Sequence, residues 1–449
     1  MVHVERPRKG EIATAPLRSA TQTDYLVLSG SAQTWEPTFT YHGFRYVQVD
    51  NWPVEQTPLD KHAVEAVVVH SDMQRTGHLK TSNSLLNKLL ENIVWSLKGN
   101  FMSVPTDCPQ RDERLGWTGD AHAFAPTSNF LYNTAGFWRN VVPVVVPRRW
   151  PSQGRRRPRI PNRRLGRRSS RKPMSTYQSY GDAIALRAQY IGAKAWIDSG
   201  IPRGPDGLWN HTYFQFGDWL DPKAPNDEPG NATTSSGLVA DAYLVYVTGL
   251  VAKMAAVLGL EADAAQYAAQ AAAAKKAYQA AWLESDGRVK YETQTGLALS
   301  LYFGLFPEGQ DNAAAARLRD VIEAAEYHVG TGFAGTHLLG LALTQYGLTD
   351  EFYRMLLQTS VPSWLYQVVQ DATTTWERWD SLLPDGSVNP NMMTSFNHYA
   401  FGSVANWMFR TIGGLAPAEP GWKTVACGPD SRGRADGGEG VVSFSVWQV

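Results

Sequence analysis

The chain has 449 residues, of which 43% are hydrophobic, 11% aromatic and 19% charged. Its length, about three times that of an ordinary domain, and its apolar content exclude a small disulfide scaffold and a disordered chain. The two cysteines, Cys108 and Cys427, are too few for a disulfide framework or a zinc cage. We therefore expect one large domain beside a smaller one, without a metal.

The formal net charge is zero, but the charges are unevenly distributed. Residues 148–172 contain 12 of the 42 Lys and Arg, with three prolines and no acidic residue. Such a run cannot bury apolar surface, so we interpret 146–174 as an atypical basic insertion or altered segment. A nucleic-acid-binding arm is an alternative, but aromatic residues do not alternate with the basic ones, since the run holds only Trp150, and we expect no nucleic acid as a partner.

Two observations bear on location. The opening residues MVHVERPRKG lack the apolar stretch of a secretory signal peptide. The most apolar later window, residues 237–260, contains Asp241 and Lys253, which are unfavourable in hydrocarbon. We expect a soluble, cytoplasmic protein with no membrane partner.

The N-terminal part has strand-like runs at 25–29, 39–50 and 63–72, which predict a partial β-sandwich over residues 1–80. From Ser82 onward the apolar period becomes helical, behind a Ser or Asn cap. Further helices are expected at 117–132, 134–146, 180–199, 234–259, 261–284, 294–304, 310–327, 335–347, 349–360 and 400–411.

So many helices without intervening strands predict an α/α barrel or a solenoid. A closed barrel is favoured because no sequence repeat of fixed length is visible. We assign it residues 81–415, with 416–449 as a tail. The Ala-rich stretch 264–282 is a strong helix former with a thin apolar edge, so it is expected on the outside of the barrel.

The segment DCPQRDERLGWTGD, residues 107–120, concentrates four carboxylates and two arginines in an irregular loop. Crowded carboxylates raise one another's pKa, which is one way to keep a carboxyl group protonated for acid catalysis. A salt-bridged loop that only joins two helices is the structural alternative.

Three further segments place acidic residues or a histidine beside aromatic residues: TTTWERWD at 373–380, FGDWLDP at 216–222 and SFNHYAFG at 395–402. Indole faces suit the C–H patches of a sugar ring, although each segment alone is equally typical of a packed core. Together, and without a phosphate loop or a metal signature, they indicate a glycoside hydrolase that works through a paired acid and base.

The same segments resemble the bacterial α-L-rhamnosidases of glycoside hydrolase family 78, and the resemblance covers about residues 23–423. It implies an (α/α)6 six-hairpin barrel, inversion at the anomeric carbon, no cofactor and a rhamnose-containing oligosaccharide or glycoside as the partner. Relative to the family pattern, the chain starts inside a β-sandwich and ends in a Gly- and Asp-rich tail, so we expect it to be shortened at both ends.

The resemblance also implies roles for individual residues. Glu113 matches the general acid and Glu377 the general base. The remaining matches are substrate contacts: Asp107, Asp120 and Arg111 to the rhamnose hydroxyls, Trp117 and Trp219 as aromatic lining with Asp218 beside the latter, and His398 as a site histidine.

Trp376 joins the substrate-binding set because it adjoins Glu377. Two alternatives remain, a different six-hairpin barrel glycosidase and an inactive barrel that binds rhamnose or another glycan.

Overall fold

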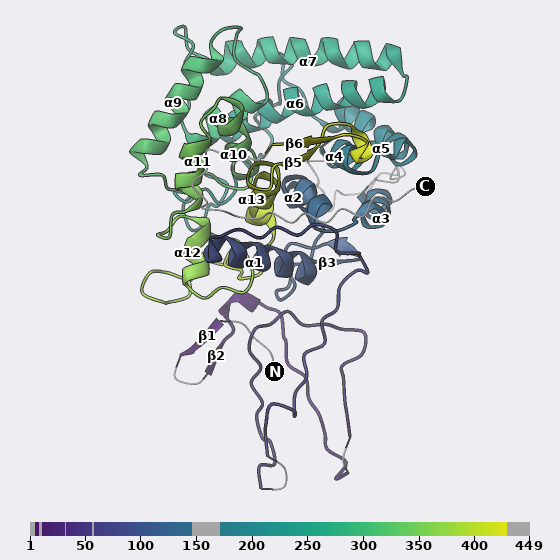
Figure 1. The fold of residues 1–449 in the computed structure, drawn as a ribbon, viewed down its shortest axis with the longest axis vertical. Helices are drawn as coiled ribbons and strands as arrows, with labels where there is room; N and C mark the ends of the chain where they lie inside the picture. Colours follow the sequence, from purple (N-terminus) through teal and green to yellow (C-terminus); the bar gives the residue numbers. More distant parts are fainter. Residues whose placement is uncertain (1–4, 9–10, 32, 56–57, 146–170, 429–449) are drawn as a thin grey trace.

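The computed structural model describes residues 5–8, 11–31, 33–55, 58–145 and 171–428, and helices predominate in this part of the chain (Figure 1). The helices are α1 (Ser84–Asn100), α2 (Thr118–Leu131), α3 (Ala135–Val145), α4 (Arg171–Tyr180), α5 (Ala183–Ala195), α6 (Ser236–Val257), α7 (Glu261–Trp282), α8 (Gln294–Tyr302), α9 (Asp311–Ala324), α10 (Thr336–Gln345), α11 (Thr349–Leu356), α12 (Trp364–Val369) and α13 (Val404–Trp407). The predicted mainly α fold is confirmed.

Side-chain caps set where several of these helices begin. The side chain of Asn83 accepts hydrogen bonds from the backbone N–H groups of Leu85 and Leu86 at the start of α1, as the sequence predicts. Asp182, Thr293 and Ser363 cap α5, α8 and α12 in the same way. Polar residues at these positions therefore fix the helix boundaries that in turn position the intervening loops.

The predicted helices differ from the observed ones in several places. The expected helix 180–199 is α5 followed by a π turn at Trp196–Gly200. α12 was not expected, because six residues are too few to show a helical period. The segment 400–411 is divided into a 3₁₀ turn, the short α13 and a π turn. Of the expected basic segment 146–174, residues 146–170 lie outside the described residues, and 171–174 begin α4.

The strand-like runs at 25–29, 39–50 and 63–72 do not form named strands in the described residues. They run as long irregular segments below the helices (Figure 1). A strand requires hydrogen bonds with a neighbour, and the named pairs lie elsewhere. These are β1 (Glu5–Arg8) with β2 (Glu11–Ala13), β3 (Phe101–Met102) with β4 (Val104–Pro105), and β5 (Leu415–Pro417) with β6 (Val425–Cys427). The last pair begins at the boundary between the expected barrel and the expected tail.

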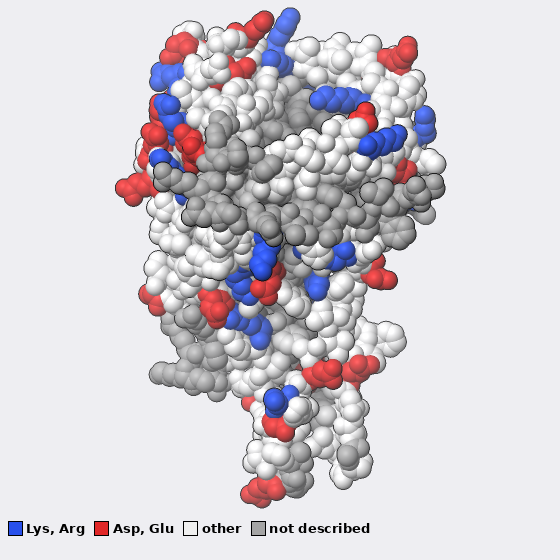
Figure 2. Space-filling view, in the orientation of Figure 1, with Lys and Arg blue, Asp and Glu red and all other residues white. Residues whose placement is uncertain are grey.

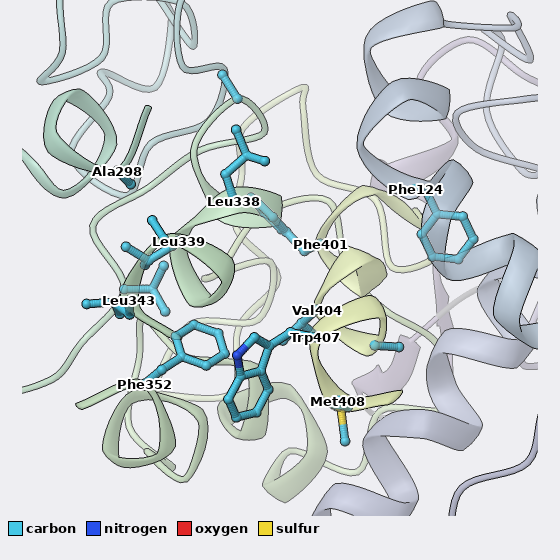
Figure 3. Packing of buried hydrophobic residues seen from close by; sticks show 14 of the residues in the cluster. Phe124, Ala298, Leu338, Leu339, Leu343, Phe352, Phe401, Val404, Trp407 and Met408 are labelled. Atoms are coloured by element: carbon cyan, nitrogen blue, oxygen red, sulfur yellow. The ribbon is translucent and has the colours of Figure 1, made fainter. Parts of the chain in front are cut away.

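The apolar core lies between the helices. Leu338, Leu339 and Leu343 of α10 pack with Phe352 of α11 and Trp407 of α13 (Figure 3). The Phe352 and Trp407 rings meet edge to face, 4.6 Å between centroids. This cluster extends to α1 and α2, so one core supports both helices that flank the acidic segment 107–117.

α6 and α7 lie side by side (Figure 1). α6 is long and apolar enough to span a membrane, but 78% of its most apolar window is buried inside the structure, as in a core helix. Among the described side chains of the Ala-rich α7, only Tyr267, Ala274 and Tyr278 are buried, which confirms its predicted outer position.

Charged side chains of both signs are interspersed on the face of the molecule shown in Figure 2. Interspersed charges produce no strong field of one sign.

Gly340 of α10 provides a test of this packing. A Cβ at Gly340 would lie 2.6 Å from Cε1 of Phe352. At Gly249 of α6 it would meet only the Cβ of Ala271, at 4.0 Å. We expect Gly340→Ala to lower the free energy of unfolding by about 1–3 kcal/mol through overpacking, whereas Gly249→Ala raises it by about 0.5–1 kcal/mol through helix propensity. Urea denaturation measures both, and equal effects would contradict the close packing at Gly340.

Candidate active site

The segment 106–117 forms a compact loop between β4 and α2. The backbone N–H of Asp107 donates to the carbonyl of Leu115 at 3.1 Å, and the N–H of Leu115 donates to Oδ1 of Asp107 at 2.8 Å. The guanidinium of Arg114 donates to the carbonyl of Pro109, within the same loop. These bonds close the loop on itself, and the side chain of Arg111, which belongs to the loop, is buried.

The Arg111 guanidinium joins three carboxylates. Nη1 lies 2.6 Å from Oε2 of Glu377, and Nη2 lies 2.9 Å from Oε1 of the same residue. Nη2 also lies 3.0 Å from Oε2 of Glu113 and 3.3 Å from Oδ2 of Asp107. The two glutamates assigned as acid and base, 264 positions apart in the sequence, therefore share one cation.

Both main-chain and side-chain bonds hold the loop that carries Glu377 against the acidic loop. The N–H of Glu377 donates to the carbonyl of Ser395, and the Ser395 hydroxyl accepts from Nε2 of Gln110, both at 2.9 Å. The N–H of Thr375 donates to Oγ of Ser96 in α1 at 2.7 Å. These bonds cross the segments at several points, so the spacing of Glu113 and Glu377 does not depend on Arg111 alone.

Glu113 is contacted at both carboxylate oxygens. Oε1 accepts a hydrogen bond from Nε1 of Trp117 at 2.8 Å. Oε2 faces Arg111 and also Nη1 of Arg18, which lies 2.9 Å away. Arg18 belongs to the N-terminal segment and was not predicted as a site residue, since no motif surrounds it in the sequence.

Burial changes the protonation behaviour of this group. Burial, followed by the neighbouring Glu113 carboxylate, raises the pKa of Asp107 to about 6, against the opposing influence of Arg111 and His398. Burial alone would lower the pKa of Arg111, but the acidic groups around it, Cys108 and Glu377 first, raise it above its ordinary value. The guanidinium is therefore a fixed positive charge.

His398 and Asp120 form a second polar pair, with Nε2 of His398 3.2 Å from Oδ1 of Asp120. Burial favours the neutral imidazole, but the hydrogen bond to Asp120 and the charges of Asp120, Glu377 and Asp107 outweigh it and raise the pKa of His398. His398 is tied to the acidic cluster by charge as well as by position, since its backbone N–H donates to Thr375 at 2.8 Å.

Aromatic rings extend from Glu113 along one side of the group. Phe216 contacts Trp117 and Trp219, with ring centroids 6.1 Å and 5.5 Å apart. All three side chains are partly exposed. Phe216 therefore joins the two predicted residues Trp117 and Trp219. It lies in the predicted segment 216–222, but the sequence does not single it out, because a Phe without a polar neighbour of its own resembles a core residue.

Two predicted substrate contacts, each next in sequence to a member of this group, have buried side chains. Asp218 is fully buried and accepts backbone N–H bonds from Gly332 at 2.8 Å and from Ala334 and Gly335, each at 2.9 Å, as well as a bond from the Thr295 hydroxyl. Trp376 is 1% exposed. It packs in a cluster with these residues: Leu17, Tyr366, Ala372, Leu382 and Phe396.

The environment of Asp218 is that of a structural carboxylate. Burial raises its pKa to about 6, although the donors from Gly332 and Thr295 oppose the rise. Three of its four donors, Gly332, Ala334 and Gly335, belong to the turn that precedes α10, and the fourth, Thr295, belongs to α8. In the structure Asp218 orders a loop, and Trp376 packs behind Glu377.

Comparison with known proteins identifies the family. Residues 74–412 match the bacterial alpha-L-rhamnosidase 6 hairpin glycosidase domain. The chain belongs to the bacterial α-L-rhamnosidase family. Residues 1–70 match the concanavalin-like domain of the same rhamnosidases. The predicted family and six-hairpin fold class are thereby confirmed.

Several α-L-rhamnosidases are similar over most of this chain. The enzyme of Streptomyces avermitilis is 40% identical over 435 residues, and that of Alteromonas sp. is 35% identical over 460 residues. These matches cover 94% and 98% of this chain but 40% and 49% of the relatives. The chain thus spans less than half the length of either curated rhamnosidase.

Two solved rhamnosidase structures superpose closely. The native Aspergillus terreus α-L-rhamnosidase matches with a TM-score of 0.89 and 54% identity, covering 94% of this chain and 50% of that one. The Streptomyces avermitilis α-L-rhamnosidase in complex with L-rhamnose matches with a TM-score of 0.85 and 39% identity, covering 95% and 41%. This rhamnosidase fold therefore extends over nearly the whole chain.

Asp218→Asn separates a structural role from substrate binding in this rhamnosidase domain. An amide offers one acceptor oxygen to four donors, so we expect the free energy of unfolding to fall by about 3 kcal/mol in urea. The exposed Asp227→Asn is the matched control. Unchanged stability together with weakened rhamnose binding would instead place Asp218 in the sugar site.

The His398–Asp120 pair predicts a pH dependence of stability. Because the folded state raises the pKa of His398, the protonated imidazole contributes to the free energy of unfolding. This contribution is fully present below about pH 6.5 and is lost as the pH rises through the pKa of the folded state. We expect the difference in melting temperature between the unmodified protein and His398→Gln to be larger at pH 6 than at pH 9. The exposed His62→Gln serves as the control, and a difference that grows toward pH 9 would contradict the assignment.

Proposed function

We propose that the chain is an inverting glycoside hydrolase that releases terminal α-L-rhamnose from glycosides or polysaccharides. Glu113 is the general acid and Glu377 the general base. The observation that carries the proposal is the shared contact of both glutamates with Arg111. The two residues were assigned from separate motifs, and a paired acid and base must face one bound sugar.

The spacing of the two carboxylates is compatible with this chemistry. Each has an oxygen within 3.0 Å of Nη2 of Arg111, so these two oxygens lie at most about 6 Å apart. The carboxyl groups as wholes can lie farther apart than these two oxygens, and their separation can therefore meet the ~6.5–9.5 Å spacing of inverting glycosidases. The distances alone also allow a closer pair, so inversion rests on the family resemblance.

In the proposed reaction, protonated Glu113 donates to the glycosidic oxygen while Glu377 removes a proton from water on the opposite face of the ring. Each carboxylate oxygen has two lone-pair directions, so Glu377 can accept from this water while it remains paired with Arg111. Arg111 holds the base in place and does not itself exchange a proton.

The surroundings suit a 6-deoxy sugar. Rhamnose has hydroxyl groups on much of its ring and a methyl group at C5. Asp107, Asp120 and His398 supply buried polar groups, whereas Trp117, Phe216 and Trp219 supply aromatic surface. We assign the hydroxyls to the first set and the methyl edge to the second. Asp218 orders the turn before α10, and Trp376 packs in the apolar cluster next to Glu377, so both support the site without contacting the sugar.

The test is turnover of 4-nitrophenyl α-L-rhamnoside beside the matching glucoside and arabinoside. We expect hydrolysis of the rhamnoside alone. Glu113→Gln and Glu377→Gln should each lower kcat by about 100- to 10,000-fold, because each removes proton transfer while sugar contacts remain. Calorimetry should show retained rhamnose binding in both variants.

The exposed Glu308→Gln is the control for the loss of one carboxylate charge. Full turnover in either catalytic variant would refute the assigned roles. Rhamnose binding without turnover in the unmodified protein would favour the inactive glycan-binding barrel. Proton NMR of the first product distinguishes the stereochemistry, since inversion releases β-L-rhamnose.

A further inference from the structure

Residues 15–22 of the N-terminal segment lie across the loop that carries Glu113. Besides the Arg18–Glu113 ion pair, the Ser19 hydroxyl donates to Asp112, and Nε2 of Gln22 donates to the carbonyl of Gln110. Leu17 is 6% exposed and packs in the cluster that contains Trp376. A segment far from the barrel in sequence thus forms one boundary of the candidate active site.

Arg18 connects two loops. One carries the proposed acid, and the other follows the proposed base in the sequence. Its Nη1 lies 2.9 Å from Oε2 of Glu113, its Nε donates to the carbonyl of Met392 at 2.8 Å, and its Nη2 lies 3.2 Å from Sδ of Met393. The side chain is 15% exposed. Its backbone φ of 56° lies in the left-handed region. This conformation costs a non-glycine residue about 1 kcal/mol or more and persists only where the surrounding contacts hold it.

We propose that Arg18 is a positioning residue for the general acid Glu113. The inference rests on the function proposed above and adds to it a residue from outside the barrel. Arg18 acts through Glu113, because its guanidinium contacts the Glu113 carboxylate and, on the other loop, Met392 and Met393.

The contacts also select which oxygen of Glu113 carries the proton. Oε2 faces two guanidinium groups, those of Arg18 and Arg111. Cations repel a proton, so a proton on Glu113 is most stable on Oε1. Oε1 accepts one bond from Trp117 and keeps a second lone pair for the proton. Arg18 thereby orients the acidic proton toward the side lined by aromatic rings.

Leaving-group dependence tests this role. A dinitrophenolate leaves without protonation, whereas methanol requires it. Variant Arg18→Met removes the donors and keeps much of the apolar stem. We expect it to lower kcat/KM for methyl α-L-rhamnoside by about 10- to 100-fold, part of what general acid catalysis contributes, and to lower that for 2,4-dinitrophenyl α-L-rhamnoside less than about threefold. Arg18→Lys, which keeps the charge, should recover most of the loss.

Ser19→Ala is the matched control, since it removes the neighbouring contact of the same segment with Asp112. We expect it to leave the ratio of the two substrates unchanged. If both Arg18→Met and Ser19→Ala lowered kcat/KM equally for the two substrates, the segment would only support folding and the inference would be wrong. Unchanged kcat/KM for methyl α-L-rhamnoside in Arg18→Met would also overturn it. Absence of turnover of the dinitrophenyl rhamnoside by the unmodified protein would overturn the proposed function and this inference together.

Discussion

The candidate active site depends on one buried positive charge. The Arg111 side chain is 2% exposed, and a guanidinium in such a position is tolerated only when carboxylates neutralise and hydrogen-bond it. Glu377 meets it with both oxygens, while Glu113 and Asp107 approach the same nitrogen. Removing any one carboxylate changes the electrostatic balance of the others, so these four residues have to be understood as a unit.

The barrel supplies the rigidity that this unit needs. α1 and α2 flank the loop of Arg111, and their apolar faces belong to the same core as α10, α11 and α13. The loop of Glu377 is tied to α1 by the Thr375–Ser96 hydrogen bonds. A close-packed core has low compressibility and resists changes in the distances between its helices. Its stability therefore maintains the spacing between side chains that are far apart in sequence.

The sequence predicts the helices and the acidic loop because both leave local signals, an apolar period in one case and a dense charged motif in the other. It does not predict Arg18, whose role arises from a tertiary contact with Glu113. Nor do the strand-like runs at 25–29, 39–50 and 63–72 predict their own pairing, since a ladder depends on a neighbour. Trp376 and Asp218 stand next to motif residues in the sequence. That position does not reveal that the Trp376 side chain is buried, or that the Asp218 carboxylate already accepts hydrogen bonds from the protein.

Asp107 and Asp218 show why a perturbed acid is not by itself a functional residue. Burial raises the pKa of both to about 6. Asp218 accepts from three backbone N–H groups and a hydroxyl, so its oxygens are occupied by the protein. Asp107 has a bond from Leu115 and a long one from Arg111, which leaves lone pairs for a sugar hydroxyl. The remaining hydrogen-bonding capacity, more than the pKa, separates a carboxylate that can bind substrate from one that maintains the fold.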